Sequence, residues 1–182
     1  MKAPNLLVFA ALSLFLLSSC SSKLTYFTED LYREQGWSDS DLKQIQFYIS
    51  QNVVLKRELT GGSSEIISGK IRVENGSQIE EVVIPKGTPG TFLFSPKDNR
   101  FAVAFEDGSD KRYLMFGPSP KYSDRFVMLA SDWSRRNGKV TYDGKQWRVG
   151  SESAYAALLV DMKKVNKYDR NSRTAKGRRV GG

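Results

Sequence analysis

Hydrophobic and polar residues alternate in short runs through the middle of the chain, from about residue 52 to residue 149. Turn-forming pairs such as Gly61-Gly62, Asn75-Gly76 and Asp98-Asn99 separate the runs. Alternation with this punctuation is typical of half-buried β-strands. The pattern predicts strands at residues 52–59, 65–74, 78–85, 91–94, 100–106, 111–116, 125–131, 139–142 and 146–149.

The last two of these runs are separated by Asp143-Gly144 alone, which predicts a two-residue hairpin turn. Closing or stacking a sheet of such strands buries its apolar face and removes exposed edges. We therefore expect a mainly β fold, a small antiparallel β-barrel or sandwich, with a short N-terminal helix and a C-terminal helix.

Helical periodicity is found on both sides of this region. Ser38 begins a sequence that resembles a capping box, and apolar residues follow it at spacings of three and four, which predicts a helix over residues 39–50. A shorter helix is expected over residues 29–34. Residues 153–165 fit a closing helix, with a strand as the alternative.

The N-terminus begins with the basic residue Lys2 and continues into a twelve-residue apolar run, residues 6–17, interrupted only by Ser13. A helix needs about 20 apolar residues to span a bilayer, whereas the apolar part of a secretory signal takes roughly 7–15. The length of the run therefore favours a signal peptide over a permanent membrane helix.

Leu17-Ser18-Ser19-Cys20 resembles the lipobox of bacterial lipoproteins. The resemblance implies that Cys20 is the lipid attachment site and the first mature residue, carrying acyl chains such as palmitate. Two or three such chains hold a protein firmly on a membrane. The alternative is an ordinary signal peptide that is cut near Ser19.

The residues after the lipobox bear on the membrane and its face. Ser21 and Ser22 take the place of the aspartate that retains lipoproteins in the inner membrane of enteric-type bacteria. The acidic residues of the surface-export motif of Bacteroidetes-type lipoproteins are missing as well. The resemblance thus implies an outer-membrane anchor with the domain facing the periplasm.

Three short motifs of the mature chain, Gly36-Trp37-Ser38, residues 116–120 and residues 176–180, are similar to small lipoproteins of Bacteroidetes-type bacteria. This resemblance implies a lineage and no mechanism. The expected organisation is a lipoprotein signal peptide at 1–19, a tether at 20–36, a β-rich globular domain at 37–165 and a flexible basic tail at 166–182.

Composition narrows the chemistry. The chain has 40% hydrophobic and 12% aromatic residues, enough for a folded core, but no histidine and a single cysteine. A Ser-His-Asp triad, a catalytic zinc site built on histidine or cysteine, a second reactive thiol and an intramolecular disulfide are therefore excluded. We expect no metal, no cofactor and no enzymatic activity.

Positive charge is concentrated at the C-terminus. Residues 163–182 hold eight Lys or Arg and one Asp, which is +7 of the net charge of +8. Such a tail fits peptidoglycan, an anionic lipid surface or another envelope protein, and an exported protein rarely meets nucleic acid. The alternative is a solvated tail without a dedicated partner. The candidate anionic-surface residues are Lys163, Lys164, Lys167, Arg170, Arg173, Lys176, Arg178 and Arg179.

A second candidate combines aromatic and guanidinium groups in Trp133, Arg135, Arg136 and Trp147, the composition of a contact surface. These residues are better explained as a core tryptophan beside a solvated loop than as a contact surface.

The remaining acidic motifs have structural interpretations. Residues 107–110 (Asp-Gly-Ser-Asp) are better explained as a turn than as a calcium loop. Adjacent carboxylates such as Glu80-Glu81 point to opposite faces of a strand and form no catalytic dyad by themselves.

Together these patterns predict a membrane-anchored periplasmic lipoprotein whose domain binds or scaffolds other components of the cell envelope. Two rival hypotheses remain. One is an envelope hydrolase that uses carboxylates or a Ser-Lys pair, neither of which needs histidine. The other is an accessory subunit of an outer-membrane complex.

Overall fold

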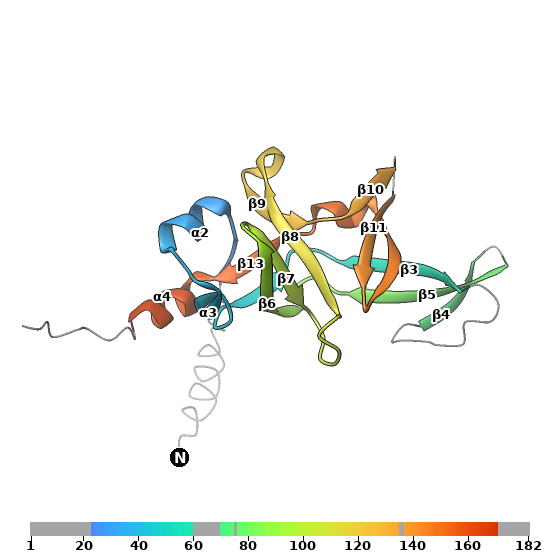
Figure 1. Ribbon diagram of the computed structural model, residues 1–182, viewed down its shortest axis with the longest axis horizontal. Coiled ribbons are helices and arrows are strands. Elements are labelled where there is room, and N and C mark those ends of the chain that lie inside the picture. Colours follow the sequence, from blue (N-terminus) through green and yellow to red (C-terminus); the bar gives the residue numbers. More distant parts are fainter. Residues whose placement is uncertain (1–22, 60–69, 75, 135–136, 171–182) are drawn as a thin grey trace, which may run out of the picture.

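The computed structural model describes residues 23–59, 70–74, 76–134 and 137–170 (Figure 1). Within these ranges the protein consists of two antiparallel sheets in a sandwich-like arrangement, not a closed barrel. The predicted mainly β class is therefore confirmed, and the sandwich is the correct one of the two expected architectures. No helix within the described ranges has the length and apolarity to cross a membrane.

The first sheet has seven strands and contains the larger part of the core. Its spatial order is β1 (Leu24–Tyr26), β13 (Leu158–Asp161), β2 (Gln46–Ile49), β6 (Pro89–Lys97), β7 (Arg100–Ala104), β8 (Tyr113–Ser119) and β9 (Arg125–Met128). The sheet curls so that β9 also bonds backbone near β1 and β13. Phe126 N–H donates to the Phe27 carbonyl at 3.0 Å, and Met128 N–H donates to the Ala156 carbonyl at 2.7 Å.

The second sheet has six strands. Their order is β10 (Ser131–Ser134), β11 (Asn137–Tyr142), β12 (Lys145–Gly150), β3 (Val53–Leu59), β5 (Ser77–Ile84) and β4 (Lys70–Glu74). Asp143 and Gly144 have φ angles of 50° and 71° and join β11 to β12, which confirms the predicted hairpin turn. The far ends of β3 and β5 and the whole of β4 extend away from the body of the molecule (Figure 1).

Short helices lie at the two ends of the described chain and between strands. They are α2 (Glu29–Gln35), α3 (Asp39–Leu42), the 3-10 helices η2 (Pro120–Tyr122) and η3 (Ser151–Tyr155), and α4 (Met162–Arg170). The predicted helix near residue 29 is confirmed, and Ser38 forms the expected capping box with Asp41 at the start of α3.

The prediction of one helix over residues 39–50 is wrong beyond Leu42. Residues 46–49 form β2, in which Phe47 and Ile49 are fully buried while Gln46 and Tyr48 are not. The apolar positions fit helical spacing and strand alternation almost equally well in so short a run. Pairing with both β6 and β13 decides the outcome, because it satisfies the backbone and buries both side chains.

The predicted closing helix over residues 153–165 is also wrong in its first part. Leu158–Asp161 is strand β13, the alternative that the sequence left open, and the helix begins only at Met162. Leu158 and Val160 are fully buried. A strand places both of these side chains on one face, toward the core.

The stretch expected to be a tether takes part in the first sheet. β1 pairs with β13, and Phe27 is completely buried beside the rings of Phe47 and Phe126, at centroid distances of 5.2 and 4.8 Å. Residues 24–37 therefore complete the fold.

A candidate binding groove between the sheets

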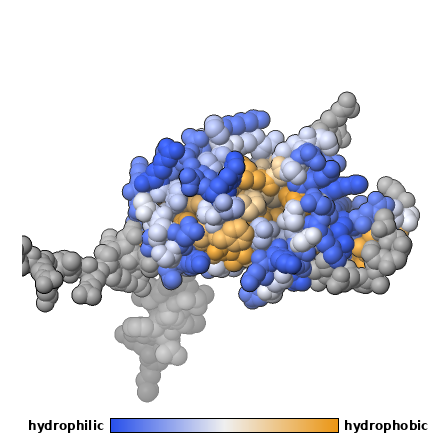
Figure 2. Space-filling view, viewed as in Figure 1, coloured by the Kyte–Doolittle hydropathy of each residue, from blue (hydrophilic) through white to orange (hydrophobic). Residues whose placement is uncertain are grey.

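A hollow of about 620 Å³ separates the outer face of β6, β7 and β8 from β11. This volume lies within the roughly 300–1,000 Å³ that is usual for ligand sites. Figure 2 shows hydrophobic residues gathered across the middle of this face, between hydrophilic flanks. This hollow and a second one that adjoins it at Arg100, Leu129 and Ala130 are together called the groove.

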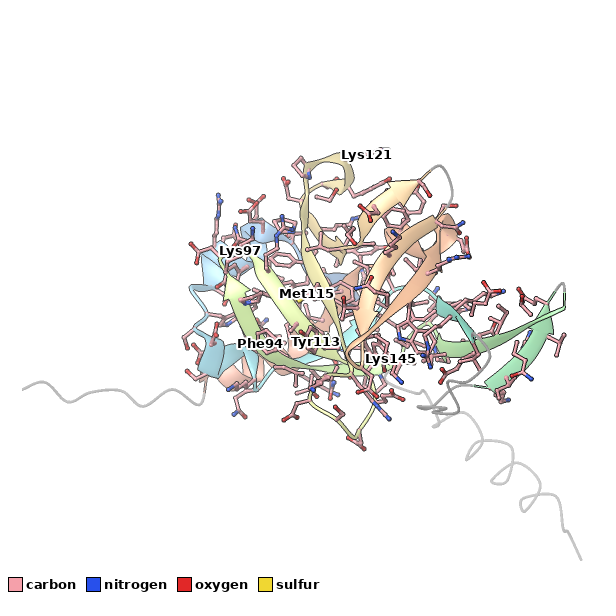
Figure 3. All side chains as sticks on the ribbon, turned by 45° about the vertical axis from the view of Figure 1, so that its right-hand side comes forward. Phe94, Lys97, Tyr113, Met115, Lys121 and Lys145 are labelled. Carbon is pink, nitrogen blue, oxygen red and sulfur yellow. The ribbon has the colours of Figure 1, made fainter. Side chains whose placement is uncertain are left out.

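The floor of this hollow is apolar. Met115, Leu129 and Val140 line it from β8, the segment after β9, and β11. Tyr113 lines one side and packs edge-on against Phe94, with ring centroids 5.2 Å apart (Figure 3). Phe94 is 40% exposed, so an aromatic surface continues from the groove onto the neighbouring face.

Three cations surround this floor: Lys97, Arg100 and Lys139. Lys139 forms an ion pair with Asp132 at 3.0 Å. No ion pair of the described residues includes Lys97 or Arg100. The Arg100 guanidinium lies against β8 at Gly117, where an added Cβ would come within 2.1 Å of Nη1. A glycine on β8 thus provides the space in which this guanidinium rests.

A second hollow of about 540 Å³ adjoins the first and shares Arg100, Leu129 and Ala130 with it. Its walls are richer in aromatic rings. Tyr122 and Tyr155 pack edge-on with centroids 5.2 Å apart, and Tyr155 is 51% exposed.

Trp133 lines the same hollow and is 45% exposed. Its ring lies against Gly138 on β11, where an added Cβ would come within 3.0 Å of the indole. Lys121, from the 3-10 helix η2, adds a further cation beside the Tyr122 ring (Figure 3). Neither hollow is lined by an Asp or Glu of the described residues.

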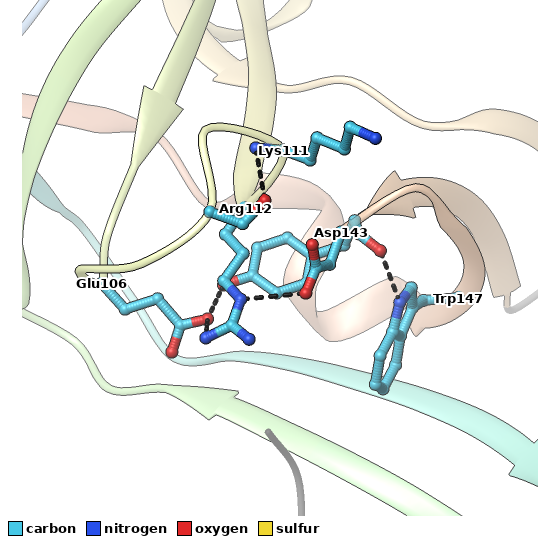
Figure 4. Close-up of polar contacts among 7 residues, drawn as sticks. Glu106, Lys111, Arg112, Asp143 and Trp147 are labelled. Carbon is cyan, nitrogen blue, oxygen red and sulfur yellow. Dashed lines mark hydrogen bonds and ion pairs between the residues drawn. The ribbon is translucent and has the colours of Figure 1, made fainter. Parts of the chain in front are cut away.

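A polar network ties the two sheets together at one end of the groove (Figure 4). The Tyr142 hydroxyl donates a hydrogen bond to Glu106, and Arg112 Nε donates to Asp143 Oδ2 at 2.9 Å. Asp143 N–H bonds the Lys111 carbonyl at 2.9 Å, and the buried Trp147 Nε1–H donates to the Tyr142 carbonyl at 2.9 Å.

Burial, followed by the bond to the Glu106 carboxylate, raises the pKa of the Tyr142 hydroxyl far above its ordinary value of 10.0. Tyr142 therefore stays protonated as a donor at any physiological pH. Because β8 begins directly after Arg112 and β11 ends at Tyr142, this network fixes the spacing of the two walls.

The predicted contact surface is divided by the structure. Trp133 is exposed and lines the groove, whereas Trp147 is only 1% exposed and belongs to the core, below the Arg57 guanidinium. Trp147 therefore contributes packing to the core and no surface to the groove. Arg135 and Arg136 lie outside the described residues.

The other predicted site residues lie either on α4 or outside the described residues. Lys163 and Lys164 are exposed on α4, and the backbone of Lys167 and Arg170 continues the same helix. Outside the described residues lie Cys20 and the remaining tail cations, Arg173, Lys176, Arg178 and Arg179.

The adjacent carboxylates of β5 point in opposite directions, as expected. Glu80 is buried and forms an ion pair with Arg57, while Glu81 lies on the other face near Lys56 and Arg72, at 3.8 and 3.4 Å. Residues 107–110 lie in the connection from β7 to β8.

Sequence reasoning missed Lys97, Arg100, Tyr122 and Tyr155, because these residues are scattered over four elements and form no motif. Only Trp133 and its neighbours had the composition of a contact surface.

No protein-family model, curated protein or solved structure matches this chain.

Proposed function

We propose that this protein is a bacterial lipoprotein, anchored through lipid on Cys20, whose β-sandwich binds another component of the cell envelope without catalysing a reaction. One observation carries the binding role. Two adjoining hollows present apolar and aromatic walls with four cations and, within the described chain, no lining carboxylate. A concave site lined by charge of one sign attracts ligands of the opposite sign.

The anchor is supported by the lipobox and by the sequence around it. Cys20 is the only cysteine in a chain without histidine, so its thiol has no disulfide or zinc-binding partner within the protein. In the sequence, only residues 21–23 separate Cys20 from Leu24, where β1 begins. The domain would then sit close to the membrane surface, within reach of envelope polymers and neighbouring proteins.

Metabolic labelling tests the anchor. Cells that express the full chain are grown with labelled palmitate, and the mature N-terminus is determined by mass spectrometry. We expect label on a protein that begins at Cys20, and an unlabelled, uncut precursor for Cys20→Ala. A matched Ser22→Ala variant should be labelled as the native chain is. A native protein without label, cut at another residue, would refute the anchor.

A further inference from the structure

We propose that the groove binds an anionic glycan chain, with its sugar rings stacked on the exposed aromatic residues and its carboxylates or phosphates paired with Arg100, Lys97 and Lys121. This inference rests on the proposed binding function and names the class of ligand. It follows from three features: the shape of the groove, its charge and the orientation of its aromatic rings.

The shape favours an elongated ligand. The two hollows, of about 620 and 540 Å³, meet at Arg100, Leu129 and Ala130, so a chain can run from one into the other past a single guanidinium. A small compact ligand would occupy only one of them. Arg100 is the residue that both parts of such a chain would contact.

The charge favours an anion. Lys97, Arg100 and Lys121 have no ion pair in the described part of the chain, and Asp132 compensates only Lys139. Arginine binds carboxylate and phosphate through two parallel N–H donors when its guanidinium is held in place. Gly117 leaves the space in which the Arg100 guanidinium lies on β8, which restrains it before a ligand arrives.

The aromatic rings favour sugars over other anions. The Trp133 indole lies against Gly138, and the Tyr155 ring packs edge-on against Tyr122. Both Trp133 and Tyr155 are nevertheless about half exposed. The electron-rich face of an aromatic ring attracts the weakly positive C–H groups on the flat side of a sugar ring. A membrane surface, by contrast, cannot enter a concave site between two sheets.

An extended acidic peptide is the nearest alternative ligand, and the strand pairing in the groove disfavours it. Peptides that add to a sheet need an unpaired strand edge. β8 pairs with β7 over Tyr113–Phe116 and with β9 over Phe116–Ser119. β11 pairs with β12 along its whole length but with β10 only at Asn137 and Lys139. The unpaired edges that these two strands offer to a peptide are therefore at most three residues long, shorter than the roughly five or six residues of a usual strand.

The test measures fluorescence anisotropy of a labelled hexagalacturonate with the mature lipidated chain in neutral phosphatidylcholine vesicles, at about 0.15 M salt to screen the basic tail. Unlabelled cellohexaose supplies rings without charge, hexaglutamate supplies charge without rings, and vesicles with added phosphatidylglycerol supply lipid phosphates. We expect hexagalacturonate to bind at least roughly tenfold more tightly than either competitor, with no displacement by phosphatidylglycerol.

Two variants address the guanidinium and one serves as a control. Arg100→Ala removes the charge, and Gly117→Ala keeps the charge but displaces its flexible end, which costs the fold little. Both should weaken hexagalacturonate binding roughly tenfold, the value of one charged hydrogen-bonded contact. Arg148→Ala removes the charge of an exposed arginine on β12, outside the groove, and should change the affinity less than twofold.

A third variant addresses the aromatic rings. Tyr155→Ala should weaken hexagalacturonate and leave the weaker hexaglutamate binding unchanged. The glycan proposal would be overturned by any of three results. These are equal affinity for hexaglutamate, displacement by phosphatidylglycerol, and full affinity for hexagalacturonate in both Arg100→Ala and Gly117→Ala. Binding of the peptide or the lipid instead would leave the proposed function standing, since the groove would still bind an envelope component. The proposed function itself would be refuted if the native protein carried no palmitate label.

Discussion

Phe27 allows the most direct test of where the domain begins. The side chain is completely buried, and its ring lies within 4.8 to 6.0 Å of the rings of Phe126, Phe47, Phe101 and Trp37. Truncation of such a ring removes its transfer free energy and leaves a cavity that the packed neighbours can only partly fill. Phe→Ala substitutions in cores cost about 3–5 kcal/mol. We expect the Phe27→Ala loss in the upper half of that range, because five aromatic neighbours lose contact at once.

The preceding residue provides a matched control. Tyr26 is 39% exposed, and the Arg125 guanidinium lies over its ring, 3.8 Å from the ring centroid. An exposed contact of this kind contributes about 0.5–1 kcal/mol. Tyr26→Ala should therefore reduce the free energy of unfolding by about 1 kcal/mol or less.

Urea unfolding followed by tryptophan fluorescence measures both variants, because Trp37 and Trp147 are buried and report loss of the core. The midpoint for Phe27→Ala should fall strongly with an unchanged m-value. If Phe27→Ala and Tyr26→Ala both stay within about 1 kcal/mol of the native chain, residues 24–37 form a spacer and their place in the first sheet is wrong.

Three further predictions concern the Tyr142 hydrogen bond, the ion pair between Glu80 and Arg57, and the tail. Tyr142→Phe should cost about 1.5 kcal/mol at pH 7, the low end for a charged hydrogen bond, because water can reach the Glu106 carboxylate. The raised pKa of Tyr142 adds a pH signature. Above pH 10 the unfolded chain releases a proton that the folded chain retains, so native stability should fall by about 1.4 kcal/mol per pH unit more steeply than that of Tyr142→Phe; parallel profiles would contradict this. Glu80→Ala, which leaves the Arg57 charge without its buried carboxylate, should cost about 3–5 kcal/mol in urea unfolding, and a loss below 1 kcal/mol would show that solvent reaches this pair. Deletion of residues 171–182 should leave the urea midpoint unchanged and weaken sedimentation with purified cell wall, and unchanged sedimentation would discard the role of the four tail cations that the deletion removes.

The alternating pattern predicted most of the strands because one face of each is buried in the core. Val53 and Leu55 in β3 are buried, as are Val140 and Tyr142 in β11, and turn dipeptides mark the ends. The pattern failed where few residues were available. Gln46–Ile49 and Leu158–Asp161 are each four residues long, and only their partners across the first sheet determine that they are strands.

The groove could not be predicted by the same reasoning, because no single element contains it. Arg100 ends up beside Gly117 only after β7 and β8 pair, and Trp133 lies over Gly138 only after β10 and β11 pair. In both cases a strand glycine leaves space for a long side chain from the next strand. The sequence shows these glycines as ordinary interruptions of a strand.

The two glycines also explain why the groove can be rigid although it is lined by long side chains. A free arginine or lysine loses roughly 2 kcal/mol of side-chain entropy when a ligand orders it. Gly117 reduces that loss for Arg100 by leaving space where its guanidinium lies against β8, and Gly138 restrains Trp133 in the same way on β11. Arg100 and Trp133 both line the second hollow, and Arg100 also lines the first. A ligand that reaches from the guanidinium to the indole would thus meet two ordered contacts, which is the condition for specific binding rather than general attraction to a basic surface.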